Sequence, residues 1–329
     1  MNLLKKFPNL KGKAVLAPMS GTTDVAFRAL CKQYDAALTY TELISSTALI
    51  KANERTESML KTDPIETLAA VQLFGEDPSE MAAAARIIED KFCVFKIIDI
   101  NCGCPATKVM NKGAGSALLR DPVKIGKIIR KVCSAVNLPV TIKIRVGFSP
   151  RQINAIEVAK IAEDAGAAAI TVHGRTVGQG YSGKADWSII KSVKDVVNIP
   201  VIGNGDVTTP EIFTQRMETS NVDAIMIGRA AASNPYIFRQ VSEYMKIGKY
   251  SKNFIQGSGD CEVDMAKNYS VLFGEYLLMA EKHEIAFAAV KNHAIQFTRG
   301  IRGAPVLRMK ISGCKNIRDL KIIIEEFSQ

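Results

Sequence analysis

The chain has 329 residues, of which 47% are hydrophobic and 23% are charged. This length suits one barrel with a small additional domain, and the composition excludes a disordered or fibrous chain. The net charge of +10 favours an anionic partner such as nucleic acid or phosphate. The sequence shows no signal peptide and no apolar run of the about 18 residues that a membrane span requires, so we expect a cytoplasmic protein without membrane association.

Eight short apolar runs, rich in β-branched residues, alternate with longer helical patterns along the first part of the chain. Most runs are continuous instead of alternating, which is typical of parallel strands buried on both faces. The predicted strands are 14–18, 36–41, 68–74, 94–100, 139–146, 168–172, 200–203 and 223–227. The predicted helices between them are 24–34, 78–91, 122–136, 152–165, 186–196 and 210–217.

This order of elements predicts a (β/α)8 TIM barrel over residues 1–245. Pro78, Pro122 and Pro210 stand where the first turn of a helix tolerates proline, and each follows an Asp or Thr suited to cap a helix. Periodicity does not distinguish a closed barrel from an open sheet, so a doubly wound sheet is the alternative fold.

The pattern changes after residue 245. Residues 246–261 are polar and glycine-containing and predict a linker, whereas residues 262–329 are helical and show no strand signal. We therefore predict a C-terminal all-α domain. Within it, residues 291–321 hold eight basic residues and one acidic residue, a net charge of +7. A solvated charged face is the ordinary explanation of such a run, but in a basic chain it also indicates a surface for a polyanion.

In a barrel, functional groups stand at the carboxyl ends of the strands and in the loops that follow. The seventh predicted strand ends in Gly-Asn-Gly-Asp (203–206), and the eighth ends at Gly228 and Arg229. Glycines let backbone N–H groups approach an anion, and arginine adds a charge-assisted contact. Tight turns alone would also use glycine, but the position of both loops favours a phosphate site.

Two further side chains indicate a ligand. Lys143 lies in an apolar strand, where a lone ammonium is costly, so we expect it to meet an anion or to have a shifted pKa. An alternating strand would instead direct it to solvent. His173 ends the sixth predicted strand beside Gly174 and Arg175, which favours ligand contact over a structural role.

Cys104 stands between Gly103 and Pro105 at the end of the fourth predicted strand. A thiol there is a candidate nucleophile, general acid or redox partner of Cys102. The seven cysteines lack the regular spacing of a disulfide framework, and no Cys or His pair follows at zinc-ligand spacing. We therefore predict no metal site.

Six motifs occur in order between residues 17 and 229. They are Ala-Pro-Met-Ser-Gly-Thr-Thr-Asp (17–24), Asp-Ile-Asn-Cys-Gly-Cys-Pro (99–105) with Lys108, Lys-Gly-Ala-Gly-Ser-Ala-Leu-Leu (112–119), His-Gly-Arg-Thr (173–176), Val-Ile-Gly-Asn-Gly-Asp (201–206) and Ala-Ile-Met-Ile-Gly-Arg (224–229). The set resembles the tRNA-dihydrouridine synthase family, and most closely its bacterial B-type branch and archaeal relatives. Position 102 departs from the family pattern, because it holds Cys where an apolar residue is more common.

The resemblance implies an FMN-bearing barrel, NADPH as the reductant and a uridine of folded tRNA as the substrate. It implies hydride transfer from flavin N5 to uracil C6 and protonation of C5 by Cys104 from the other side. The positions that match cofactor contacts are Pro18, Met19, Ser20, Gln72, Lys143, His173, Asn204, Gly205, Asp206, Gly228 and Arg229. Those assigned to the substrate are Asn101, Lys108 and Arg175 in the motifs and Arg299, Arg302 and Arg308 in the basic stretch. We expect a monomer.

Three other functions compete with this interpretation. An FMN barrel of the dihydroorotate dehydrogenase type would also place a Cys or Ser near the flavin, but its small acidic substrate needs no basic appendage. A class I aldolase would use Lys143 as the Schiff-base amine and leave Cys104 and Gln72 without a role. A non-catalytic RNA-binding protein would use the barrel as a scaffold only. A yellow purified protein would exclude the last two.

Overall fold

The computed structural model describes residues 6–251 and 265–328, and it contains a closed barrel of eight parallel strands. The strands are β1 (Lys13–Leu16), β2 (Thr39–Ser45), β3 (Ala69–Phe74), β4 (Ile97–Cys102), β5 (Val140–Arg145), β8 (Ala169–His173), β9 (Val201–Asn204) and β10 (Ala224–Ile227). Their order is β1-β10-β9-β8-β5-β4-β3-β2. Leu16 N donates to Leu38 O at 2.9 Å and Ala37 N donates to Ala14 O at 3.0 Å, so the first strand also meets the chain entering β2. The predicted TIM barrel is confirmed, and the open sheet is excluded.

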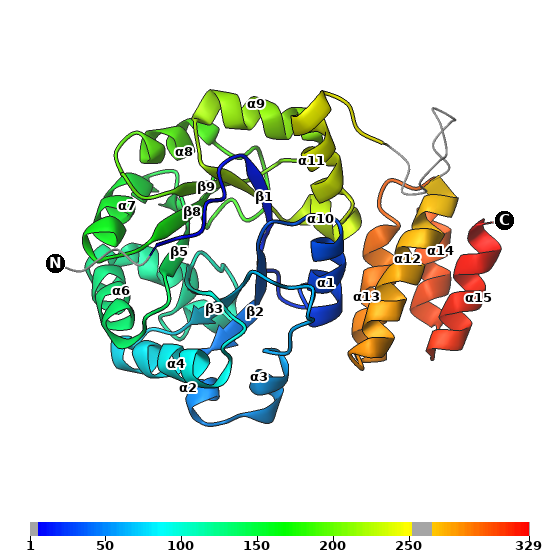
Figure 1. Cartoon of the computed structure of the whole chain (residues 1–329), viewed down its shortest axis with the longest axis horizontal. Coiled ribbons are helices and arrows are strands. Elements are labelled where there is room, and N and C mark those ends of the chain that lie inside the picture. The colour runs from blue at the N-terminus through cyan, green and yellow to red at the C-terminus, as the bar shows by residue number, and fades with distance from the viewer. Residues whose placement is uncertain (1–5, 252–264, 329) are drawn as a thin grey trace.

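Helices surround this barrel (Figure 1). They are α1 (Val25–Gln33), α2 (Ser46–Ile50), α3 (Glu54–Ser58), α4 (Pro78–Lys91), α5 (Thr107–Met110), the 3-10 helix η1 (Gly115–Arg120), α6 (Pro122–Ala135), α7 (Ala155–Asp164), α8 (Trp187–Lys194), α9 (Pro210–Ser220), α10 (Arg229–Ser233) and α11 (Ile237–Ile247). The predicted caps are confirmed, because the side chains of Asp77, Asp121 and Thr209 each accept a backbone N–H from the first turn of the helix that follows.

Side chains alternate between two cores along each strand. In β4, Ile98, Ile100 and Cys102 belong to the large cluster shared with the surrounding helices, whereas Ile97 belongs to a smaller cluster inside the barrel. The same alternation places Asp99 inside the barrel, where its carboxylate accepts hydrogen bonds from β3 and β5. The barrel interior is therefore apolar at one level and polar toward the carboxyl ends of the strands.

One predicted helix begins late. Residues 152–165 are predicted as helical, but a hairpin of β6 (Gly147–Ser149) and β7 (Gln152–Ile153) occupies the start, and α7 begins at Ala155. The carbonyl of Val146 accepts the backbone N–H groups of Asn154 and Ala155, both at 3.1 Å, which fixes the chain in this turn. The hairpin and α11 were not predicted, and α11 extends two residues into the predicted linker; residues 252–261 of that linker lie outside the described residues.

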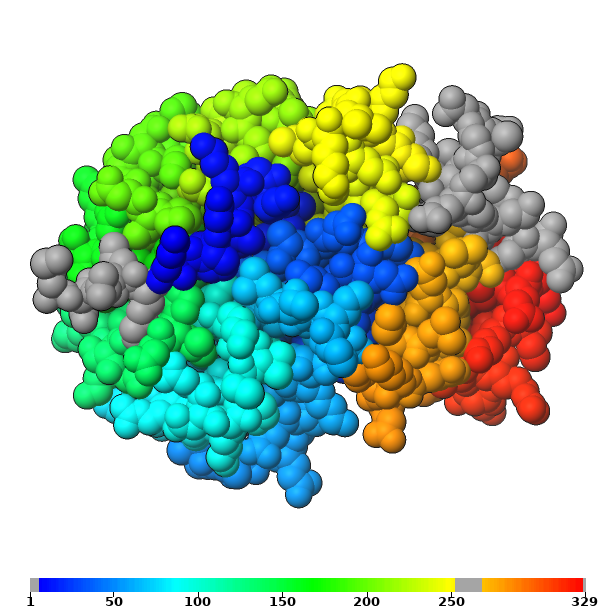
Figure 2. Space-filling model, in the orientation of Figure 1, coloured from blue at the N-terminus to red at the C-terminus, as the bar shows by residue number. Residues whose placement is uncertain are grey.

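The described C-terminal region consists of α12 (Met265–Lys282), α13 (Phe287–Phe297), α14 (Ala304–Gly313) and α15 (Ile317–Ser328), so its predicted helical character is confirmed. These helices lie together beside α1, on the side of the barrel opposite α6 and α7 (Figure 1). In Figure 2 the orange α12 and α13 adjoin the blue surface of the barrel without a break. Among the described residues, no helix has the length and apolarity to cross a membrane. The domain boundary itself stays a prediction.

Candidate active site

A cavity of about 1240 Å³ opens at the carboxyl ends of the barrel strands and is bordered on one side by α13 and α14. Most of the predicted site residues line it, although they come from distant parts of the sequence. They are Pro18, Met19, Ser20, Gln72, Asn101, Cys104, Lys143, His173, Asn204, Gly205, Asp206, Gly228, Arg229, Arg299 and Arg308. Lys108, Arg175 and Arg302 are not among the residues that line it.

A chain of side-chain hydrogen bonds connects the barrel interior to Cys104. Asn101 Oδ1 accepts from Gly103 N at 3.2 Å and from Cys104 N at 2.9 Å. Asn101 Nδ2 in turn donates to Gln72 Oε1 at 2.7 Å, and Gln72 Nε2 donates to Asp99 Oδ2 at 2.6 Å. Because the two backbone donors fix the direction of the Asn101 amide, the orientation of the whole chain is set, and one N–H of each amide is left for a ligand.

Asp99 is the buried end of this chain, and the sequence analysis gave it no role. Its second oxygen accepts from Thr141 Oγ1 at 2.6 Å. Burial raises the pKa of Asp99 to about 6, although hydrogen bonds from Gln72 and Thr141 and the charge of Lys143 act in the opposite direction. An acidic residue within an otherwise apolar buried strand was the signal that marks such a group.

Lys143 on β5 lines the pocket, so the alternative in which its side chain faces the outer surface does not hold. Its Nζ donates to Asn204 Oδ1 at 3.3 Å. Burial, followed by the charge of Arg145, lowers the pKa of Lys143 to about 8, while Asp99 and Cys104 raise it. This direction agrees with the expected shift in the pKa of Lys143, and its contact with an anion stays a prediction.

The pKa of His173 reflects the positive charges in this part of the pocket. Burial, followed by the charges of the cations around the ring, lowers the pKa of His173 to about 2; these cations are Lys143, Arg145, Arg175 and Arg229. The imidazole is therefore neutral at physiological pH. Cations gathered around a buried ring favour an anion as the ligand of this end of the cavity.

Two glycines shape the anion end of the pocket. Gly205 has φ +136°, and a Cβ added there would lie 2.5 Å from Ala185 Cβ, so a side chain is excluded. A Cβ on Gly228 would lie 3.4 Å from Ala17 Cβ and 3.7 Å from Met19 Sδ, in space that opens on the cavity. The missing side chain of Gly205 lets the loop pack against Ala185, and that of Gly228 leaves backbone exposed to the cavity.

Asp206 organises the arginines of these loops. Its two oxygens accept from Arg175 Nη1 and Nη2, both at 2.8 Å, and Arg229 Nη2 donates to Oδ1 at 2.9 Å. Burial raises the pKa of Asp206, but these contacts outweigh burial and hold the pKa below its ordinary value. Arg175 is 2% exposed and also donates to the carbonyls of Ser182 and Gly183, so the structure places it behind the pocket wall as a support for Asp206.

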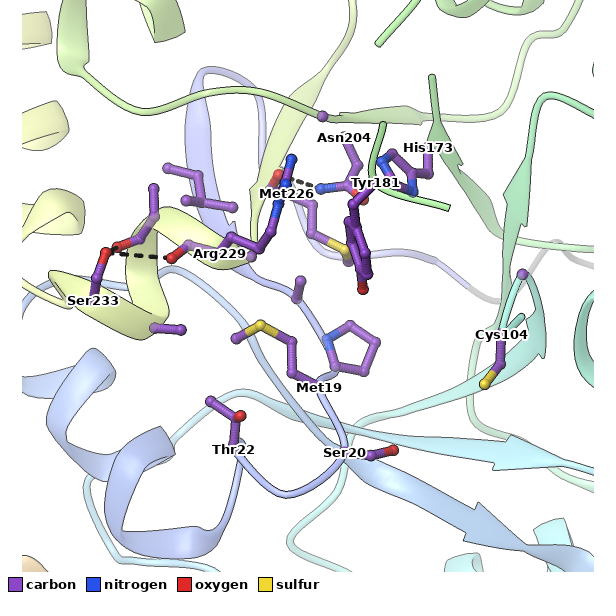
Figure 3. A pocket seen from close by; sticks show the side chains of 18 of the residues that line it. Met19, Ser20, Thr22, Cys104, His173, Tyr181, Asn204, Met226, Arg229 and Ser233 are labelled. Carbon is purple, nitrogen blue, oxygen red and sulfur yellow. Dashed lines mark hydrogen bonds between the residues drawn. The ribbon is translucent and has the colours of Figure 1, made fainter. Parts of the chain in front are cut away.

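Figure 3 shows Cys104 apart from Met19, Tyr181 and Arg229, on the far side of the open space. Tyr181 lines the cavity and is 61% exposed, with the Arg229 guanidinium 4.8 Å and that of Arg145 5.8 Å from its ring centroid. The sequence analysis gave neither Tyr181 nor Arg145 a role. A tyrosine in a glycine-rich loop after a barrel strand was the available signal.

Cys102 differs from Cys104 in every respect that matters for reactivity. Its side chain is fully buried in the apolar cluster between barrel and helices, and burial raises its pKa well above the ordinary value. Both cysteines are free thiols. Within residues 6–251 and 265–328, no three His, Cys, Asp or Glu side chains are grouped as metal ligands, and the absence of a metal stays a prediction.

The predicted basic residues divide into two groups. Arg299 and Arg308 line the cavity from the helical region, whereas Lys108 and Arg302 are exposed outside it. One cation of the basic stretch has an acidic partner, because Lys321 Nζ lies 3.1 Å from Glu281 Oε1.

The family model described as "Dihydrouridine synthase (Dus)" matches residues 15–328. The chain belongs to the dihydrouridine synthase family. It is 40% identical over 277 residues to a protein of Shewanella oneidensis named tRNA-dihydrouridine synthase B, covering 83% of this chain and 85% of that one. A protein of Pectobacterium carotovorum with the same name is 43% identical over 240 residues, covering 73% and 74% of the two chains.

Solved structures agree with the barrel fold of this dihydrouridine synthase family member. 2-Naphthoyl-CoA reductase superposes with a TM-score of 0.58 at 10% identity, covering 74% of this chain and 52% of that one. Histamine dehydrogenase from a Rhizobium species gives a TM-score of 0.50 at 13% identity, with 83% and 48% covered. The chain spans about half the length of these two enzymes, and at such identities the likeness concerns the fold alone.

Proposed function

We propose that the chain is a tRNA-dihydrouridine synthase that uses FMN and NADPH to reduce the C5–C6 bond of uridines in tRNA. The observation that carries this proposal is one cavity with an anion-binding end, a thiol on the opposite side and two arginines of a basic helical region at its border. Family membership and the names of the relatives support the same activity.

The described residues fit FMN. Gly228 would leave room for a phosphate that Arg229 would hold, and the neutral His173 and the cationic Lys143 line the pocket beside Gly205. Pro18, Met19 and Ser20 line the same cavity, and their loop would hold the isoalloxazine ring. When bound and reduced, FMN would supply the hydride, and the barrel supplies orientation and electrostatics.

We assign to Cys104 the role of the general acid that protonates C5 of uracil. Reduction at C6 of uracil places negative charge toward C5 and O4, so a general acid must reach C5. Asn101 holds the backbone of Cys104 in place, and its spare N–H, like that of Gln72, is a donor suited to a carbonyl oxygen of the bound groups. The thiol gives its proton to C5, and solvent restores it.

A turnover assay tests the whole proposal. Purified protein with NADPH and an unmodified tRNA transcript should form dihydrouridine, detected by mass spectrometry of the digested RNA. NADPH oxidation should require the tRNA. Turnover of dihydroorotate without any effect of tRNA would instead support the small-substrate flavoenzyme, and a colourless protein that binds tRNA would support the scaffold function.

We expect one non-covalent FMN per chain, seen as flavin absorbance bands in freshly purified protein. Arg229→Ala should weaken FMN binding at least about tenfold, because a charge-assisted hydrogen bond contributes about 1.5–3 kcal/mol. Arg86→Ala removes an exposed arginine on α4 and is the matched control. Flavin-free protein that takes up no added FMN would exclude this cofactor.

We expect the basic helical region to bind the tRNA backbone. Replacing Arg299, Arg302 and Arg308 by Ala should raise the dissociation constant for tRNA and leave flavin reduction by NADPH unchanged. The slope of log affinity against log salt should fall by about 0.7–0.9 for each phosphate that the variant no longer neutralises. Replacing Lys127, Arg130 and Lys131 on α6 removes the same charge from the opposite side of the barrel and should change the affinity much less. Equal affinities in both triple variants would remove this role.

A further inference from the structure

The segment between β1 and α1, residues 17–24, is here called the β1–α1 loop, and it forms one wall of the cavity. It is a compact turn. The backbone N–H groups of Thr22 and Thr23 donate to Met19 O at 3.1 and 3.0 Å, and Met19 N donates to Thr23 Oγ1 at 3.2 Å. Displacing this turn would therefore move Met19 and its neighbours at the cavity as one unit.

The tip of the loop is held by a helix more than 260 residues away in the sequence. Asn292 Nδ2 on α13 donates to Gly21 O at 2.9 Å. One turn later, Gln296 Nε2 donates to Thr22 Oγ1 at 3.3 Å. Both amide side chains also line the cavity, together with residues of the loop itself.

The end of the loop is anchored to the same helix. His293 is fully buried on α13, and its Nε2 lies 3.1 Å from Asp24 Oδ2. Its ring packs between Phe27, at 4.8 Å between ring centroids, and Tyr276, at 4.4 Å, and the Tyr276 hydroxyl also donates to Asp24. The other Asp24 oxygen caps α1 through Phe27 N at 2.9 Å. The same carboxylate therefore starts α1 and ties it to the helical region.

The barrel bonds the tip of the loop from one side. Gly21, at φ +69°, has open space around its Cα, and its N–H donates to Glu42 on β2. On the other side of the tip, the carbonyl of Gly21 and the hydroxyl of Thr22 are bonded by α13. The loop is thus held between the barrel and α13, so a shift of α13 removes one of its two supports.

We propose that Asn292 and Gln296 are positioning residues for the β1–α1 loop, through which the docking of the helical region sets the affinity of the barrel for its flavin. This inference rests on the proposed function, which places the cofactor against the loop. Coupling of this kind is reciprocal, so an RNA that shifts α13 changes flavin affinity by the same factor as flavin changes RNA affinity.

The test compares FMN binding to full-length parent and variant chains by quenching of flavin fluorescence. The double variant Asn292→Ala/Gln296→Ala should bind FMN about threefold to thirtyfold more weakly, because it removes two hydrogen bonds that hold the loop. Asn292→Asp keeps the shape but replaces the donor by a charged acceptor that repels the Gly21 carbonyl, so it should weaken binding in the same direction. The control Glu325→Ala/Glu326→Ala alters two exposed residues of α15 and should bind FMN like the parent.

The absorbance spectrum of bound flavin and the thermal midpoint of the cofactor-free protein separate positioning from general destabilisation. A shifted spectrum with an unchanged midpoint is the expected result. Equal FMN affinity in the parent and in the double variant overturns the inference, as does an equal loss in the α15 control. A parent chain that binds no FMN overturns the proposed function, and this inference with it.

Discussion

Cys104→Ala is expected to lower uridine reduction about 10²–10⁴-fold, the range that a general acid contributes. FMN retention, NADPH oxidation by added electron acceptors and tRNA binding should stay at the level of the parent. The reason is that the Cys104 side chain stands across the cavity from the anion end, and its place in the loop is fixed through its backbone N–H by Asn101. Single-turnover measurement of dihydrouridine formation on pre-reduced enzyme isolates this step.

Cys102→Ala is the matched control. Its thiol faces the helices in an apolar cluster and does not line the cavity, so its loss should cost some stability and little rate. The two substituted cysteines lie two residues apart in the same motif. A parent rate in Cys104→Ala combined with a large loss in Cys102→Ala would reverse the assignment of the two thiols.

The fold was predictable because its signals are local and repeated. Continuous apolar runs marked all eight barrel strands, and Pro78 and Pro122 after capping aspartates marked the first residues of α4 and α6. The hairpin of β6 and β7 was not predicted because its two strands have only five residues together, too few to show an alternation of apolar and polar residues. Hydrophobic periodicity also could not predict closure of the barrel, because closure depends on backbone hydrogen bonds such as that from Ala37 N to Ala14 O.

The site was predictable where position in the barrel and chemistry agree, as for Lys143 and the loops at Gly205 and Gly228. The sequence did not show which polar side chains bond to each other. Arg175 was therefore expected at the substrate, although the structure buries it behind Asp206. Contacts such as Asn292 with Gly21 join residues 271 positions apart, and no local pattern reports them.

Arg28→Met is expected to lower the free energy of unfolding by about 3–5 kcal/mol, because it leaves a buried carboxylate without its cation. Arg28 is 1% exposed, and its Nε and Nη2 donate to the two oxygens of Glu66 at 2.9 and 3.2 Å. Urea unfolding followed by circular dichroism measures the change. The exposed i,i+4 pair of Lys191 with Asp195 is the contrast, and Lys191→Ala should cost less than about 1 kcal/mol.

The same guanidinium also reaches the cavity wall, since Arg28 Nη1 donates to Thr23 O at 2.9 Å at the end of the β1–α1 loop. Arg28→Met should therefore weaken FMN binding as well as stability. Adding Glu66→Gln removes the stranded charge, so the double variant should regain a large part of the lost stability. The bond to Thr23 is still missing in that double variant, so its FMN affinity should stay low. If the double variant does not regain stability, Arg28 acts through packing and not through its charge.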